Sequence, residues 1–183
     1  PRSTLFPYTT LFRSEEAYSE TPADTIGDYS LVHSTPTIKA YKHNNDDSLI
    51  VGVRGTYDKA DVAADAALAA GRLRYTQRYR DDSDTLKQLL NRYHGDVTTA
   101  SHSLGGAIAD KLGNDYHDRV RGGIAFNPAY DTKQLVTGGR SDIQRYYARK
   151  DPLSYLGGKA LKNVHWVDSG ATSSLAAHRL DNF

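Results

Sequence analysis

The stretch Ala100-Ser101-His102-Ser103-Leu104-Gly105-Gly106 decides the fold. It follows a run that turns from apolar to small residues, Asp96–Ala100, and leads into Ala107–Leu112, whose apolar residues recur with helical spacing. A serine between a strand and a helix, with small residues two positions before and after it, is the pattern of a nucleophile elbow. Larger side chains at those positions would collide with the neighbouring strand and helix. We therefore predict that Ser103 lies at the apex of a tight strand–turn–helix.

One position departs from the usual form of this pattern. Gly105 fits two positions after Ser103, but Ser101 stands two positions before it, where glycine is usual. Serine is small enough for the turn, and its hydroxyl is a rival to that of Ser103. The alternative interpretation is an ordinary Gly-Gly helix start after a strand, which needs no reactive serine.

The composition is that of a globular protein with one domain. The chain has 183 residues, and its 23 Lys and Arg against 22 Asp and Glu give a net charge of +1. The basic residues are scattered, so we expect no nucleic-acid partner. With no cysteine, neither disulfides nor thiolate metal sites are available. No apolar stretch has the length needed to cross a bilayer.

The first residues stand apart from the rest. Residues 4–14 resemble the translation of a sequencing-library adapter, so residues 1–14 are interpreted as an arm foreign to the natural protein. The alternative is a genuine extended arm. On the adapter interpretation the natural start lies upstream and is missing, which leaves open whether the natural chain has a secretory leader and leaves the compartment undetermined. The remaining residues, 15–183, are predicted to form the single domain.

Segments with strand patterns alternate with segments that favour helices. Thr37–Lys42 and Ser48–Val53 flank the turn signal Asn44–Asp47 and predict a hairpin. Glu15–Ser34 is polar and mixed, and is interpreted as a loose lead-in or short helix. Ala60–Leu73 is rich in alanine and favours a helix.

A second helix, further strands and a loop are expected beyond this segment. Asp82 or Ser83 is expected to cap the helix, which ends at Gly95. The other segments are strands at Val120–Phe126, Ile143–Ala148 and Val164–Val167, and a loop at Asp131–Arg140. This alternation predicts an α/β fold with a mostly parallel central sheet flanked by helices.

A serine nucleophile needs a histidine base that is held by a carboxylate. Loops at the carboxyl ends of parallel strands meet at one edge of a sheet, so the acid should follow a later strand. Asp151 directly follows Ile143–Ala148, and Pro152 ends that strand. Asp131 is the rival acid, and Asp168 is a weaker one. An ordinary turn is the alternative interpretation of Asp151-Pro152.

His178 is the predicted base because it lies downstream of the last strand, in a terminal segment that can reach back to the serine. His165 lies inside an expected strand and should face the sheet surface, and the His102 side chain should point away from its neighbour Ser103. The others are interpreted as solvated: His33, His43, His94 and His117. Without the rest of the pattern, His178 would be an ordinary surface histidine.

An acyl-transfer site also needs donors that face the developing oxyanion. The backbone N–H of Leu104 is one candidate, since it follows the serine at the start of a helix. Gly55-Thr56 is the other, because it follows an early central strand and offers a backbone N–H and a hydroxyl. The alternative is a plain strand-to-helix turn.

Four stretches in order resemble the class 3 (fungal-type) lipase family: residues 51–56, 102–106, 147–153 and 177–183. The resemblance implies a small α/β-hydrolase fold and hydrolysis of carboxylic esters, often of lipids, without cofactor or metal. It implies Ser103 as nucleophile, Asp151 as acid and His178 as base, with Thr56 and Leu104 as the oxyanion hole. Three further residues are assigned supporting roles: Asp61, Gly55 and His102.

The expected partner is a small-molecule or lipid ester, with transient contact to a lipid interface. The chain is shorter than typical members of that family, and Arg72–Arg80 is its only candidate lid. Two other hypotheses stay open: a non-catalytic binding or structural domain that retains the fold, and an acyltransferase.

Overall fold

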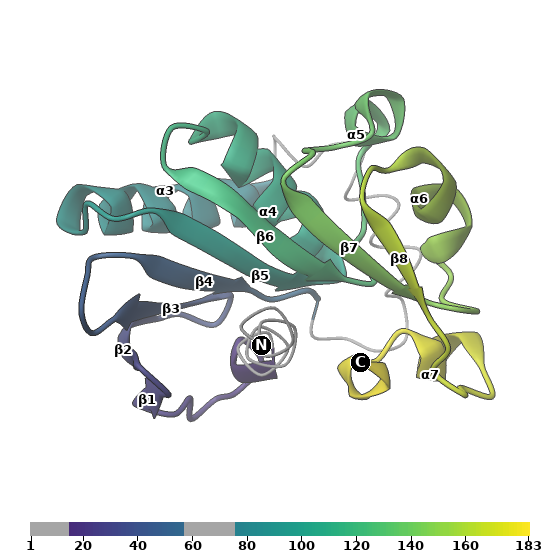
Figure 1. The fold of residues 1–183 in the computed structure, drawn as a ribbon, viewed down its shortest axis with the longest axis horizontal. Helices are drawn as coiled ribbons and strands as arrows, with labels where there is room; N and C mark the ends of the chain where they lie inside the picture. Colours follow the sequence, from purple (N-terminus) through teal and green to yellow (C-terminus); the bar gives the residue numbers. More distant parts are fainter. Residues whose placement is uncertain (1–14, 57–75) are drawn as a thin grey trace.

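One sheet of eight strands, paired in chain order from β1 to β8, forms the frame of the computed structural model, which describes residues 15–56 and 76–183 (Figure 1). The strands are β1 (Thr25–Ile26), β2 (Tyr29–Ser34), β3 (Ile38–His43), β4 (Leu49–Val53), β5 (Val97–His102), β6 (Val120–Phe126), β7 (Ile143–Ala148) and β8 (Val164–Val167). Strands β1 to β4 pair antiparallel. Strands β4 to β8 pair parallel. The predicted α/β class and the expected hairpin of β3 and β4 are confirmed.

Helices connect the parallel strands and cover the sheet. Their bounds are α3 (Gln77–Arg92), α4 (Leu104–Asp115), α5 (Thr132–Thr137), α6 (Ser154–Ala160), α7 (Ser174–Ala177) and the 3-10 helix η2 (Leu180–Asn182). Leu86 of α3 and Ile108 of α4 pack in one core cluster with Val51 and Val97 of the sheet, all fully buried. Burial of each such side chain stabilises the fold by about 1.5–3 kcal/mol. Figure 1 shows α7 and the purple segment before β1 on the other side of the strands from α3 and α4.

Two expected loops contain regular structure. Glu15–Ser34, interpreted as a lead-in, holds β1 and β2, which turn at Gly27 with a φ of 55°. β2 is half-buried along most of its length, so its sequence lacks the apolar–polar alternation that marks a strand. The loop Asp131–Arg140 holds α5, whose first turn is fixed by a capping box between Asp131 and Gln134.

Helix α3 begins earlier than predicted. Thr76 caps it by accepting from the Tyr79 backbone N–H, so neither Asp82 nor Ser83 is the cap. Asp82 is buried inside the helix, where it accepts from Thr37 Oγ1 at 2.6 Å and from Arg78 Nε at 2.6 Å. The Asp82 carboxylate, which the sequence pattern suggested as a helix cap, therefore makes a tertiary contact instead.

Several predictions concern residues that lie partly or wholly outside the described part of the chain. The arm at 1–14, the helix at 60–73 and Asp61 lie outside the described part of the chain. Of the candidate lid Arg72–Arg80, residues 77–80 belong to α3 and 72–75 lie outside the description. Within residues 15–56 and 76–183, no helix combines the length and the apolar character that a bilayer crossing requires.

The carboxyl ends of the parallel strands share one edge of the sheet. Gly55 follows β4, Ser103 follows β5, Asn127 follows β6 and Asp151 follows β7. This edge is where open parallel sheets place their reactive groups.

Candidate active site

Ser103 lies on a strained turn between β5 and α4. Its backbone has a φ of 54° and a ψ of −129°, a conformation that costs about 1–3 kcal/mol for a residue with a side chain. A Cβ atom on Gly105 would lie 2.1 Å from the Val53 carbonyl oxygen, and one on Gly106 would lie 2.4 Å from Pro128 Cβ. The glycines therefore allow α4 to approach β4 and the chain beyond β6, and the surrounding packing holds the serine at the apex.

The rival hydroxyl faces away from this apex. Ser101 is buried in β5, and its Oγ donates to the Ile124 carbonyl of β6 at 3.3 Å. A serine at this position thus adds a hydrogen bond between neighbouring strands and leaves the Ser103 hydroxyl without a competitor.

Three side chains from distant parts of the sequence form one hydrogen-bonded row. Ser103 Oγ lies 2.9 Å from His178 Nε2, and His178 Nδ1 is hydrogen-bonded to Asp151 Oδ2. The Asp151 side chain is fully buried, and its other oxygen accepts from the Leu153 backbone N–H at 2.8 Å. Since the carboxylate can only accept, Nδ1 carries the proton and Nε2 accepts from the serine. Such a row can remove the proton from an attacking hydroxyl.

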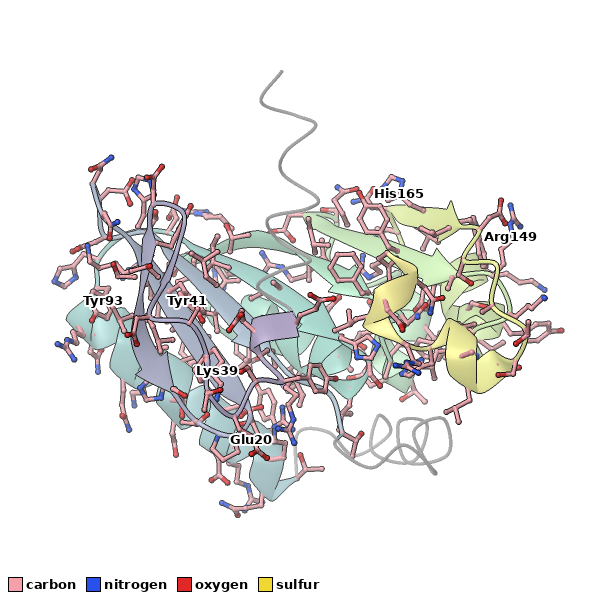
Figure 2. All side chains as sticks on the ribbon, turned by 90° about the horizontal axis from the view of Figure 1, so that it is seen from below. Glu20, Lys39, Tyr41, Tyr93, Arg149 and His165 are labelled. Carbon is pink, nitrogen blue, oxygen red and sulfur yellow. The ribbon has the colours of Figure 1, made fainter. Side chains whose placement is uncertain are left out.

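The alternative candidates for the acid and the base have other contacts in the structure. Asp131 caps α5, and the exposed Asp168 pairs with Arg149. His165 lies exposed on β8, bonded to Gln144, and Figure 2 shows it with Arg149 at one rim of the molecule. None of these three residues is bonded to Ser103 or His178 among residues 15–56 and 76–183.

Two candidate oxyanion donors flank the serine. Leu104 is the first residue of α4, a position whose N–H has no acceptor within the helix. A Cβ atom on Gly55 would lie 2.8 Å from Ser103 Cβ, so the loop after β4 touches the serine. Thr56 follows, and its Oγ1 is buried without a hydrogen-bond partner in the part of the chain described. An unpaired buried hydroxyl is costly, and an oxyanion would satisfy it.

A second hydrogen-bonded row supports the first from behind. The Gly55 N–H donates to Tyr18 Oη at 2.9 Å, and Tyr18 Oη lies 2.8 Å from His102 Nδ1. His102 Nε2 lies 2.7 Å from the His178 carbonyl oxygen. Because that carbonyl only accepts, Nε2 carries the proton and Nδ1 accepts from the tyrosine. The row ties the loop after β4 to the backbone of His178.

Burial fixes the charge of both side chains in this row. It raises the pKa of Tyr18 to about 12, so the hydroxyl keeps its proton. Burial, followed by the charge of His178, lowers the pKa of His102 to about 3, so the ring stays neutral. Sequence reasoning assigned His102 a supporting role and missed Tyr18, which lies in a mixed polar segment without any motif.

Asn127 is a second residue that sequence reasoning missed. It is fully buried at a φ of 40°, and its Nδ2 donates to the Ala177 carbonyl at 2.9 Å. Its Oδ1 accepts from the Ala148 N–H, also at 2.9 Å. One amide thus joins the chain before His178 to the end of β7, three residues before Asp151. The Asn-Pro pair signalled only the end of a strand.

The lowered pKa of His102 predicts a pH-dependent stability. The unfolded chain protonates this ring below its ordinary pKa of 6.5 and the folded protein does not until about 3. The contribution of the neutral His102 ring to the free energy of unfolding is therefore fully present above the pKa that the ring has in the unfolded chain. This contribution is lost as the pH falls below that pKa. Between about pH 6 and pH 4.5, the free energy of unfolding measured in urea should fall with decreasing pH in both proteins. We expect the fall to be steeper for the wild type than for His102→Gln, by roughly 1 kcal/mol per pH unit. Parallel slopes for the two proteins would contradict this account.

The fold is shared with solved lipase structures. A triacylglycerol lipase from Penicillium expansum matches with a TM-score of 0.57 and 13% identity, covering 93% of this chain and 80% of that one. The Lip2 lipase from Yarrowia lipolytica matches with a TM-score of 0.60 and 13% identity, covering 96% and 82%. No family model matches the sequence, and neither does any curated protein. The likeness is one of fold, and it establishes a small α/β-hydrolase fold with a mostly parallel sheet.

Proposed function

We propose that this protein is a serine carboxylic ester hydrolase that works through a covalent acyl-enzyme. The row Ser103–His178–Asp151 at the carboxyl edge of the sheet is the observation that carries the proposal. The fold shared with two lipases supports it.

In the first half of the reaction, Ser103 Oγ attacks the ester carbonyl carbon while His178 Nε2 takes its proton. Asp151 keeps the imidazole oriented and stabilises the positive charge that the ring acquires. The Leu104 N–H, with the N–H and hydroxyl of Thr56, donates to the oxyanion, and each such donor contributes about 3 kcal/mol. His178 then protonates the leaving alcohol as the C–O bond breaks.

In the second half, water replaces the alcohol. His178 takes a proton from water, the hydroxide oxygen bonds to the acyl carbon, and the tetrahedral species forms again at the same donors. Its collapse returns the proton from His178 to Ser103 and releases the carboxylic acid. The chemistry of the proposal needs no metal or cofactor.

Lipid esters or related acyl esters are the proposed substrates. The two structures of the same fold are named as lipases, one of them a triacylglycerol lipase. Large apolar side chains are exposed on the helices after β6 and β7 and near the chain end: Val136, Tyr155, Leu156 and Leu175. Of these, Tyr155 and Leu156 are neighbours on α6, and we propose them for a transient contact with a lipid surface.

A serine-reactive fluorophosphonate probe tests the proposal directly. We expect the probe to label the wild-type protein once, at Ser103, as identified by mass spectrometry of the peptides. Ser101→Ala is the matched control and should be labelled like the wild type, because that hydroxyl faces β6. A folded protein that resists labelling would instead favour a non-catalytic binding domain.

A further inference from the structure

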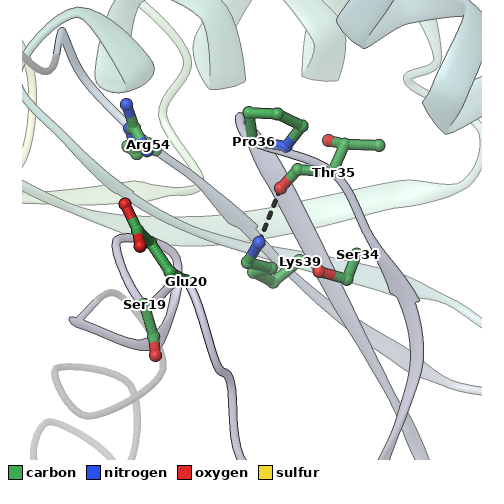
Figure 3. Close-up of a pocket in the computed structure, with 7 residues that line it drawn as sticks. All are labelled: Ser19, Glu20, Ser34, Thr35, Pro36, Lys39 and Arg54. Atoms are coloured by element: carbon green, nitrogen blue, oxygen red, sulfur yellow. Dashed lines mark hydrogen bonds between the residues drawn. The ribbon is translucent and has the colours of Figure 1, made fainter.

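A pocket of about 470 Å³ lies beside the loop that carries Gly55 and Thr56 (Figure 3). The described segment before β1, the end of β2 with the turn after it, strand β3 and the residue after β4 all contribute to its wall. The polar side chains that line it are Ser19, Glu20, Ser34, Thr35, Lys39 and Arg54.

Lys39 is unusual because it is buried without a carboxylate. It is only 5% exposed, and its Nζ donates to the Thr35 carbonyl at 2.6 Å. No carboxylate oxygen lies within 4.0 Å of this Nζ among the residues that the structure describes. A buried ammonium is almost always paired with an anion. Two of the three Nζ donors are thus left for a ligand.

One neighbour of Lys39 adds positive charge, and another is a ring that stays neutral. Arg54 lines the same pocket as Lys39, and its charge, after burial, lowers the pKa of the Lys39 ammonium. His33, interpreted from sequence as solvated, has a buried Nε2 without a partner in the described part of the chain. Burial and then Lys39 lower the pKa of its ring. Among the described residues that line the pocket, Glu20 is the single carboxylate, and it is exposed.

We propose that this pocket binds an anionic group, a carboxylate or a phosphate, through the two donors of the Lys39 ammonium that Thr35 leaves unused. Such an anion supplies the negative charge that residues 15–56 and 76–183 do not place beside Lys39. Figure 2 shows Lys39 and Glu20 near each other on one side of the molecule, and in Figure 3 the Glu20 carboxylate points toward Arg54. An anion would therefore lie on the Lys39 side of the pocket, away from Glu20.

The pocket is close to the proposed active site. Arg54 immediately precedes Gly55, which touches Ser103, and its guanidinium lies 5.5 Å from the centre of the Tyr18 ring. Tyr18 in turn belongs to the row that supports His178. The anion therefore comes from one of two sources, a free anion or an acidic group carried by the ester substrate. The second source rests on the proposed function.

The first experiment measures binding without turnover. Inorganic phosphate and acetate are titrated into the Ser103→Ala protein by isothermal calorimetry. We expect saturable binding of at least one of them, weakened about 10-fold or more by an added Lys39→Met. The matched control is Lys42→Met, because Lys42 lies on the same strand but bonds to the turn before β4. Circular dichroism establishes that each variant is folded.

The second experiment separates the two sources. Wild-type kcat/KM is compared for the p-nitrophenyl monoester of glutaric acid and for neutral p-nitrophenyl valerate. If the substrate carries the anion, Lys39→Met lowers the ratio of these values about 10-fold and phosphate competes only with the acidic ester. If the anion is free, phosphate binds and the ratio is unchanged.

Absence of saturable anion binding, together with a ratio that Lys39→Met does not change, would overturn the anion site. Binding of phosphate by a protein that hydrolyses neither ester would instead count against the proposed function and leave the anion site standing.

Discussion

Ser103→Ala is expected to lower kcat for p-nitrophenyl ester hydrolysis by about 10⁴-fold or more. Alanine removes the atom that forms the acyl-enzyme, and a water molecule held by His178 is a poor replacement. Binding contacts and oxyanion donors are untouched, so KM should change little. Stability should also change little, because the variant retains the backbone of the turn. Steady-state kinetics on the purified, folded variant measure both kcat and KM and so test this expectation.

Ser101→Ala provides the comparison for this experiment. It removes a hydroxyl of the same kind two residues away, one that bonds to the Ile124 carbonyl. We expect near wild-type kcat and a loss of stability of about 1 kcal/mol. Full turnover by Ser103→Ala, or inactivity of Ser101→Ala alone, would identify Ser101 as the nucleophile instead of Ser103.

Asp151→Asn should lower kcat by about 10⁴-fold as well. The amide matches the carboxylate in shape, but its NH2 group can donate to His178 Nδ1 and so move the imidazole proton to Nε2. That nitrogen then no longer accepts from Ser103 Oγ. The ring also loses the negative charge that stabilises its protonated form during the reaction. Burial of the Asp151 side chain leaves no water to replace that charge.

The rival carboxylates are matched controls for this variant. Asp168 is exposed and pairs with Arg149, so Asp168→Asn should leave both kcat and stability at wild-type levels. Asp131→Asn acts on the cap of α5 and should leave kcat unchanged. If Asp131→Asn were the inactive variant instead, the acid would follow β6 and the role given to Asp151 would be wrong.

Local sequence was sufficient for the features that depend on neighbours in the chain. The small residues around Ser103 predicted the turn, because steric limits at a tight bend act within a few positions. The later strands, such as Val120–Phe126, were predicted with their observed bounds, since a buried strand is a continuous apolar run. Asp151 was predicted as the acid because it directly follows a later strand of a parallel sheet, and the order serine, acid, histidine is the one usual in α/β-hydrolases.

Contacts between distant segments decided the rest. Three acids follow predicted strands, with Asp151 preferred over Asp131 and over the weaker Asp168. The path of the chain after β7 is what brings Asp151 to His178. Tyr18 and Asn127 hold that arrangement through hydrogen bonds to residues far away in the sequence, so no local pattern marks them. Lys39 was predicted only as part of a strand, and its burial became apparent in the tertiary structure. Periodicity and sterics act along the chain, whereas hydrogen bonding and charge burial depend on which segments the fold brings together.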